Sequence, residues 1–287
     1  MSGPESPAGP VDLKSQMARA AASLHDAPAP KASAATSDLS IDETLLLHSI
    51  DWEPVELVFG AAVVSVPGGV WNWGDGEIVQ ASDAHAKAIE VASLHMDRQC
   101  AHVHGWGVVG VSVDVAIHSH HIDVRLLGTA VRPTRPKPTE KRQFDNRGGF
   151  ISDLSARDFV LLRQAGWAPV GLTFGTSFVY APRRSAGTVL QQKGQNVELA
   201  NLTTAMYSAR ESAMERLQAS ALSLGGQGVV AVRVWEGPVS FAAHAIQFSA
   251  VGTAVRLEAD AHQYCQPQVV LPLDDSVVQF DATSLRH

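Results

Sequence analysis

The feature that most constrains the fold of this chain is an internal repeat. Residues 37–60 and 152–175 align without a gap, and 12 of the 24 positions are identical, starting with Ser-Asp-Leu-Ser in both copies. Two later matches, 107–109 with 228–230 and 128–132 with 252–256, lie 121 and 124 residues apart, against 115 for the first. The matched segments occur in the same order in both copies, and the distance between matching positions increases along the chain. The sequence therefore predicts two copies of one unit, with two short insertions in the second.

The repeat divides the chain into two domains and three connecting parts. We predict a disordered tail over 1–36, a diverged first repeat over 37–132, a linker over 133–151, a second repeat over 152–256 and an extension over 257–287. The tail is rich in Ala, Pro and Ser and has no aromatic residue, so it cannot bury enough apolar surface to fold alone. The tail, or the basic stretch 133–149, offers a site for an unknown protein partner, although a solvated tail and linker is the simpler interpretation.

Each repeat predicts the same succession of a short helix, strands, a longer helix and a β-hairpin, which is an α+β fold. Ser40 followed by Glu43, and Ser155 followed by Asp158, indicate the starts of the two short helices. The longer helices are predicted near 83–103 and 204–224. Alanines recur every four residues along the second of them and allow a close approach to a sheet. A strand within 71–79 is left open, and late strands are predicted at 269–273 and 277–280.

The hairpin of the first repeat is predicted residue by residue. Alternation places Val109, Val111, Val113, Val115 and Ile117 on one face of a strand. A turn centred on Ser119-His120 then sets Ile117 opposite Ile122. The same register places His118 beside His121 on the other, solvent-facing side.

Three motifs stand out in the second repeat. They are Ala-Met-Tyr-x-Ala-Arg-Glu-x-Ala-Met-x-Arg-Leu at 205–217, Leu-Gly-Gly-x-Gly-Val-Val-x-Val at 224–232 and Gly-Thr-Ala-Val at 252–255. Together they resemble the YbjQ family, small bacterial domains labelled as heavy-metal-binding. The Ser-Asp-Leu-Ser lead-in is similar to an actinobacterial branch with two such domains in tandem. The resemblance implies α+β domains that form homo-oligomeric rings, often pentameric. The first repeat departs from the pattern, with Ile89 in place of the Arg and Val103-His104-Gly105 in place of Leu-Gly-Gly.

Six of the twelve histidines fall in the first repeat between positions 95 and 121 and suggest a metal site. In the predicted register His118 and His121 share the solvent side with Asp123, and two imidazoles with a carboxylate suit Zn, Cu or Ni. Water or His120 would supply a fourth ligand, and His102 and His104 would join only if the fold brings them close. The alternative is that these histidines decorate an exposed turn, because the second repeat keeps only His244.

Composition excludes several classes of protein. Against 29 acidic residues there are 22 basic ones, a net charge of −7, which argues against nucleic-acid binding. Two cysteines make no disulfide framework, and no apolar run approaches the length that spans a bilayer. No secretory signal opens the chain, so we expect a cytoplasmic protein. Cys100 is expected to be a buried hydrophobic residue.

A catalytic site is not assembled by any motif in the sequence. Glu90 and Glu211 occupy equivalent helix positions and are open to acid–base work, cation binding or pairing across an interface. Trp71 and Trp73 lie on a glycine-rich loop that either contacts a ligand or partner or caps the edge of a sheet. We therefore expect a non-catalytic binding protein, with a structural ring-forming module as the alternative and a small-molecule enzyme as a minor one.

Overall fold

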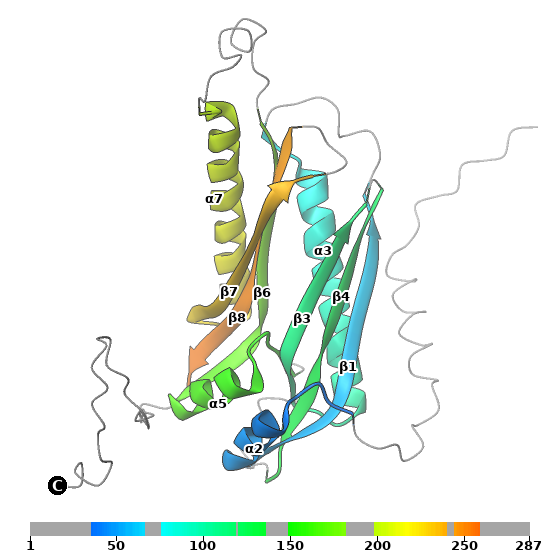
Figure 1. Cartoon of the computed structure of the whole chain (residues 1–287), viewed down its shortest axis with the longest axis vertical. Coiled ribbons are helices and arrows are strands. Elements are labelled where there is room, and N and C mark those ends of the chain that lie inside the picture. The colour runs from blue at the N-terminus through cyan, green and yellow to red at the C-terminus, as the bar shows by residue number, and fades with distance from the viewer. Residues whose placement is uncertain are drawn as a thin grey trace, which may run out of the picture. The chain divides into compact units, whose positions relative to one another are not determined.

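A computed structural model describes residues 36–66, 76–118, 120–135, 149–181, 198–239 and 244–258. The chain from Thr36 onward forms one compact unit. Within the described residues the fold is mixed α+β, with four helices and eight strands in two four-stranded sheets (Figure 1). None of the described helices is both long and apolar enough to cross a membrane.

The first sheet is built almost entirely by the first repeat, and its strand order is β1-β4-β3-β5. A short helix α2 precedes β1, and a long helix α3 separates β1 from the β3–β4 hairpin. The bounds are α2 Ile41–Ser49, β1 Trp52–Ser65, α3 Val79–His102, β3 Gly107–Ile117, β4 His121–Pro133 and β5 Phe150–Ile151.

The second sheet repeats this plan with the order β2-β6-β8-β7. Its elements are β2 Gly76–Glu77, α5 Ala156–Gln164, β6 Trp167–Tyr180, α7 Ala200–Ser223, β7 Gly228–Pro238 and β8 Ala245–Leu257. Two short strands are exchanged between the repeats. Strand β2 of the first repeat pairs with β6, while β5, just ahead of the second repeat, pairs in parallel with β3. The exchange ties the two sheets into one unit.

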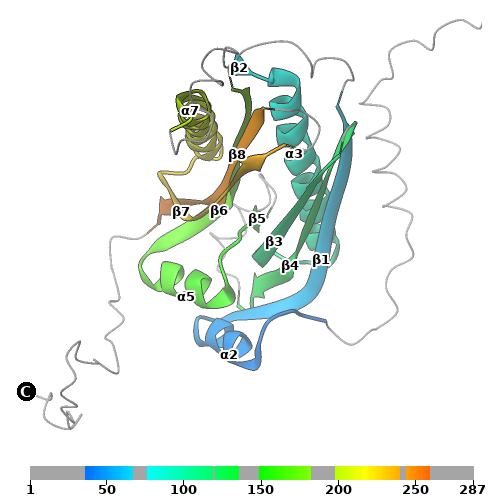
Figure 2. The ribbon, with the colours of Figure 1, turned by 45° about the horizontal axis from the view of Figure 1, so that its top comes forward.

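The layers follow from the two long helices. Helix α3 packs on β1 and β4 of its own sheet and also contacts β6 of the second sheet, whereas α7 covers the opposite face of that second sheet. Figure 2 shows α3 between the two sheets and α7 on the far side of the second. The largest apolar core accordingly contains residues of α3, of the first sheet and of the α3-facing side of the second.

Glycines and alanines set the close contact between each helix and its sheet, as the alanine stripe predicts. A Cβ placed on Gly175 of β6 would lie 1.9 Å from the carbonyl oxygen of Ala213, and one on Gly60 of β1 would lie 2.2 Å from that of Ala92. Both glycines are therefore required by the helix above them. The short helices begin as predicted, because Ser40 and Ser155 each accept a hydrogen bond from the backbone nitrogen three residues later.

The predicted hairpin register is confirmed, with Ile117 opposite Ile122, Val115 opposite Val124 and Asp114 opposite Arg125. The predicted single face for all five hydrophobic residues of β3 is wrong at its start. A bulge lies between Val109 and Ser112, where Gly110 has φ +68°. Because the bulge reverses the alternation, Val109 packs in the cluster under α5, while Val111 joins the main core.

The long helices begin four residues earlier than predicted, at Val79 and Ala200. No side-chain hydrogen bond caps either start, so no Ser, Thr or Asp signal marked it. The predicted linker 133–151 is structured at both ends, since Pro133 belongs to β4 and β5 occupies 150–151. The expected tail, the Trp71–Trp73 loop, Ser119 of the turn and the late strands at 269–273 and 277–280 lie outside the described residues.

Candidate functional site

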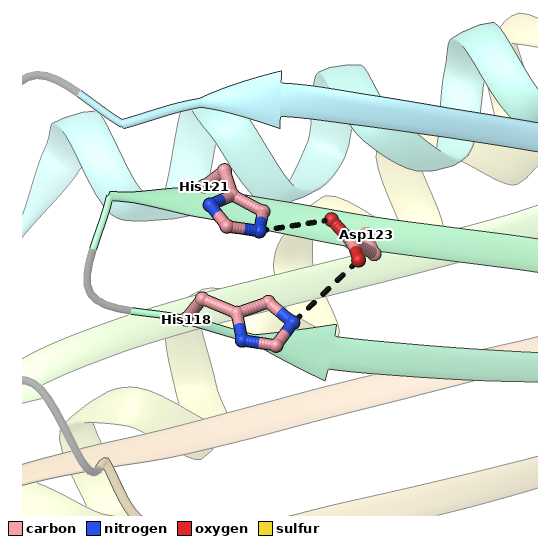
Figure 3. A group of neighbouring side chains, drawn as sticks. All are labelled: His118, His121 and Asp123. Carbon is pink, nitrogen blue, oxygen red and sulfur yellow. Dashed lines mark ion pairs between the residues drawn. The ribbon is translucent and has the colours of Figure 1, made fainter.

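Three predicted metal ligands meet at the end of the β3–β4 hairpin. His118 follows the last residue of β3, His121 opens β4, and Asp123 lies two residues further along β4. His118 Nε2 is 3.5 Å from Asp123 Oδ2, and His121 Nε2 is 3.5 Å from Asp123 Oδ1. The two imidazole rings stack with their centroids 4.4 Å apart, and both present Nε2 to the carboxylate (Figure 3).

The spacing of these three groups suits a small divalent cation. Their candidate ligand atoms all lie within 4.8 Å of one another. Ligands at about 2.0–2.2 Å from a tetrahedral zinc lie roughly 3.3 Å apart, close to the separations of 3.5 Å between nitrogen and oxygen here. Asp123 Oδ1 is buried and makes no hydrogen bond in the described structure, and it lies 3.5 Å from His121 Nε2. Two imidazoles and a carboxylate would leave further coordination positions to water.

The remaining predicted ligands are not part of this group. His120 is exposed, and its backbone oxygen accepts a hydrogen bond from Val66. His102 is the last residue of α3 and His104 follows it, beside the start of β3. The triad lies at the other end of that eleven-residue strand, about 33 Å away at 3.3 Å per residue. His104 instead adopts φ +58° and ends the helix, as Gly225 does in the second repeat.

Three other residues singled out in the sequence have structural surroundings. The Cys100 side chain is buried and donates to the Gly107 carbonyl oxygen at 3.5 Å. Burial, together with the nearby Asp97, raises the pKa of the Cys100 thiol to about 12, so it is not a reactive thiolate. Glu90 is exposed and pairs with Lys87 at 2.9 Å, and Glu211 is exposed on α7.

Sequence reasoning missed a second candidate site, the contact between the two repeats, which we call the junction. On the first-repeat side it is formed by β2, the outward face of α3, the edge of β3, and α2 with the start of β1. On the second-repeat side it is formed by β5, α5 and the α3-facing side of β6. Phe178 of β6 is fully buried there, with its ring 6.0 Å from that of His85 on α3. Phe159 of α5 meets Trp52 edge-on, with centroids 5.1 Å apart.

A polar clamp closes one end of the junction. The carboxylate of Glu77 in β2 binds the guanidinium of Arg216 on α7 through both oxygens, and also accepts hydrogen bonds from Ser82 at 2.8 Å and Ser177 at 3.0 Å. Burial by itself raises the pKa of the Glu77 carboxyl, but these hydrogen bonds outweigh it and hold that pKa below its usual value. Glu77 is therefore a charged link between the repeats.

The repeat alignment exposes an asymmetry at the junction. Residues buried there by the other repeat have counterparts that are open to solvent. Phe178 is 0% exposed and its counterpart Val63 70%, while Val160 of α5 is 2% exposed and its counterpart Leu45 63%. On the helices, His85 is 2% exposed, whereas its counterpart Met206 is 41% exposed. Aligning the repeats finds these pairs, but only coordinates reveal which member is covered.

Comparison with known proteins agrees with the motifs. Residues 194–258, from just before α7 to the end of β8, match a family model described as "Putative heavy-metal-binding". The chain is also 35% identical over 245 residues to the "Encapsulin nanocompartment protein Rv1762c" of Mycobacterium tuberculosis (strain ATCC 25618 / H37Rv), an alignment covering 83% of this chain and 92% of the relative. The chain therefore belongs to the YbjQ-like heavy-metal-binding family and is related to this mycobacterial protein.

Proposed function

We propose that this chain is a non-catalytic assembly protein whose copies join head to tail by repeating its own internal junction. The observation that carries the proposal is the asymmetry of exposure. In the second repeat, α5 and the α3-facing side of β6 are buried by the first repeat, and their counterparts on the first repeat are exposed. The outward face of α3 is buried by the second repeat, and its counterpart on α7 is exposed. One chain thus presents the two complementary halves of a contact that it already makes once.

The apolar half on the first repeat lies on α2 and the outer face of β1 and β4. Its exposed residues include Ile41 at 81%, Leu45 at 63% and Val63 at 70%. Their counterparts Ala156, Val160 and Phe178 are at most 2% exposed within the chain. Covering large apolar side chains removes them from water and so favours association.

The other half is the outward face of α7 with the free edge of β7. Among the described strands, β7 has β8 on one side and no partner on the other. In its counterpart β3, the free edge is taken by the lead-in of the second repeat, through hydrogen bonds from Gly110 to Leu154 at 2.7 Å and from Ser152 to Val108 at 2.9 Å. Ala231 repeats the bulge of Gly110, with φ +54° against +68°. Strand β7 is thus shaped to receive Ser37–Leu39 of a second copy in the same way.

A contact between unlike surfaces continues from copy to copy and gives a closed ring when the rotation closes. The related mycobacterial protein is named as an encapsulin nanocompartment protein. We therefore place the assembly of this chain in the cytoplasm, as a component that acts with a protein compartment of that kind. The proposal does not require a catalytic group.

Sedimentation velocity of the full chain and two matched variants tests the proposal. Val63→Lys places a charge in the proposed contact, whereas Leu222→Lys places the same charge on α7 outside it, and the two residues are 70% and 71% exposed. Wild type and Leu222→Lys are expected to form the same oligomer, while Val63→Lys is expected to dissociate. A monomeric wild type, or equal assembly of all three proteins, would contradict the proposal.

A second candidate function, transition-metal binding, is supported by the geometry of His118, His121 and Asp123. The triad lies on the same side of the first sheet as Val63, which is the cross-strand partner of Asp123. The histidines would supply neutral nitrogen ligands and Asp123 a negative oxygen ligand, a set that fits Zn, Cu or Ni. The family description points to the same class of ligand.

Calorimetric titration of Zn, Cu and Ni separates this candidate from a decorative histidine cluster. The variant His118→Ala/His121→Ala removes both imidazoles, and His102→Ala/His104→Ala removes two histidines at the other end of β3. We expect one metal per chain for wild type and for the second variant, and affinity at least tenfold weaker for the first. Equal affinity in both variants would dismiss the triad as a site.

A further inference from the structure

Both residues of the polar clamp, Glu77 and Arg216, have counterparts at the matching positions of the other repeat. Within the chain, Glu77 immediately precedes Ile78, the residue that caps α3 with φ −89° and ψ 76°. At the matching place in the second repeat, Glu198 precedes Leu199, which caps α7 with φ −89° and ψ 74°. Glu198 is exposed. The acidic residue and the backbone that presents it are therefore repeated on the surface proposed to meet a second copy.

The basic partner of Glu77 is Arg216, and a histidine stands at the matching position of the first repeat. Arg216 on α7 donates from Nη1 to the Thr176 carbonyl oxygen at 2.7 Å. The counterpart of Arg216 is His95 on α3, whose Nδ1 lies 2.8 Å from the carbonyl oxygen of Ala61. Ala61 is the counterpart of Thr176, 115 residues earlier. The imidazole thus occupies the position at the edge of β1 that the guanidinium occupies at the edge of β6.

We propose that His95 of one copy binds Glu198 of the next, and that this contact makes the joint between copies sensitive to protonation. This inference rests on the head-to-tail assembly proposed above. Within the chain, an arginine keeps its charge at every physiological pH. Between copies the cation would be a histidine, the side-chain type whose charge changes in the physiological pH range. The joint between copies therefore tightens on acidification, whereas the pair of Arg216 and Glu77 inside the chain keeps both charges.

Few charged groups surround His95 in the proposed contact. Arg216 is stabilised as a cation by Glu77, Asp83 and Glu215. The counterparts of these acids are Glu198, Thr204 and Leu94, so only Glu198 would bring a negative charge to His95 from the second copy. On its own helix, His95 has Asp97 and Arg98 as its nearest charged neighbours in sequence, with opposite signs, and its contact on β1 is the uncharged Ala61 carbonyl.

The experiment measures the self-association constant of the full chain by sedimentation equilibrium at pH 8.0, 7.0, 6.0 and 5.5. We expect wild type to associate about three- to tenfold more tightly at pH 5.5 than at pH 8.0, because a charged imidazole attracts the Glu198 carboxylate more strongly than a neutral one. His95→Arg is expected to associate tightly at every pH, and Glu198→Gln weakly at every pH. A His102→Asn/His104→Asn variant, which changes two histidines at the far end of β3 from the hairpin, is the control and should keep the pH dependence.

A charge exchange supplies the decisive comparison. His95→Glu and Glu198→Arg should each weaken association at pH 8.0, and the double variant should restore it. If no protein associates at any pH, the head-to-tail assembly itself is wrong. If wild type associates but the variants share its pH dependence and the double variant does not restore binding, the assembly stands and the contact between His95 and Glu198 is overturned.

Discussion

The two repeats follow one plan but meet different surroundings, and the difference is concentrated where they touch. In the second repeat, the lead-in, α5 and the α3-facing side of β6 are buried by the first repeat. In the first repeat the corresponding side chains on α2 and β1 face solvent, as Leu45 and Val63 demonstrate. The comparison teaches that the internal contact is directional, because each repeat uses one surface to receive and another to dock.

The largest expected effect is a difference in unfolding free energy between variants of Phe178 and of its exposed counterpart Val63. Phe178→Ala empties a fully buried site at the junction and should lower the free energy of unfolding by about 3–5 kcal/mol. Val63→Ala, at the counterpart position, should change it by less than about 0.5 kcal/mol in the isolated chain because Val63 is 70% exposed. Urea unfolding at a concentration that keeps the chain monomeric measures both, and equal losses would break the comparison.

The next effect concerns the helix residues His85 and Met206. Burial lowers the pKa of His85 to about 4, and neither ring nitrogen has a hydrogen-bond partner in the described structure. Because the unfolded chain takes up this proton near pH 6.5 and the folded chain only near pH 4, stability is lost as the pH falls through that window, by about 3 kcal/mol in all.

His85→Met borrows the residue of the second repeat and should remove this part of the acid sensitivity. Unfolding free energies of wild type and His85→Met, measured between pH 7 and pH 4, give the contribution of His85 by difference. Parallel pH profiles for the two proteins would show that His85 is solvated and that the junction opens near α3.

A smaller effect tests whether both repeats hold their helices equally close. Gly175→Ala would force a Cβ against the backbone of α7 and should cost about 1–3 kcal/mol of unfolding free energy. Gly60→Ala should cost a similar amount through α3. Gly237→Ala, where nothing lies within 4 Å of the added Cβ, is the matched control and should be nearly neutral. A neutral Gly175→Ala would place α7 further from its sheet.

The smallest effect concerns the caps of the two short helices. Ser40→Ala and Ser155→Ala should each cost about 1 kcal/mol, because each removes an acceptor for a backbone N–H at a helix start. Helix α5 is held at the junction by Phe159 and Val160, whereas the counterpart face of α2 is exposed. Hydrogen exchange should therefore accelerate in α2 on losing Ser40 and change little in α5 on losing Ser155. The reverse order would contradict the exposure of α2.

Much of the local fold could be predicted from the sequence, because alternation and capping are local signals. The register from Ile117–Ile122 onward could be predicted by setting the hydrophobic residues of the two strands opposite each other. The bulge at Gly110 could not be foreseen, since one glycine in a valine-rich strand does not reveal its φ angle. The strand left open within 71–79 is found as β2, but the pairing of β2 and β5 across the repeats was missed, because two residues are too short for any periodicity.

The candidate site divides in the same way. His118, His121 and Asp123 were brought together by the predicted register alone, which depends on residues close in sequence. His102 and His104 depended on the path of the chain after α3, and the length of β3 separates them from the hairpin. The junction depends on contacts between residues about 100 positions apart, such as Ser82 with Phe178, and no local pattern encodes which of two equivalent surfaces is covered.

Site-directed crosslinking between two different variants tests the central claim most directly. One chain carries Val63→Cys and the other Met206→Cys, the counterparts of Phe178 and His85, whose rings lie 6.0 Å apart within the chain. Both are made with Cys265→Ser, and Cys100 is buried with a raised pKa. With a short bismaleimide, head-to-tail assembly predicts a covalent dimer only when the two variants are mixed. Crosslinking of either variant with itself, or none in the mixture, would contradict it.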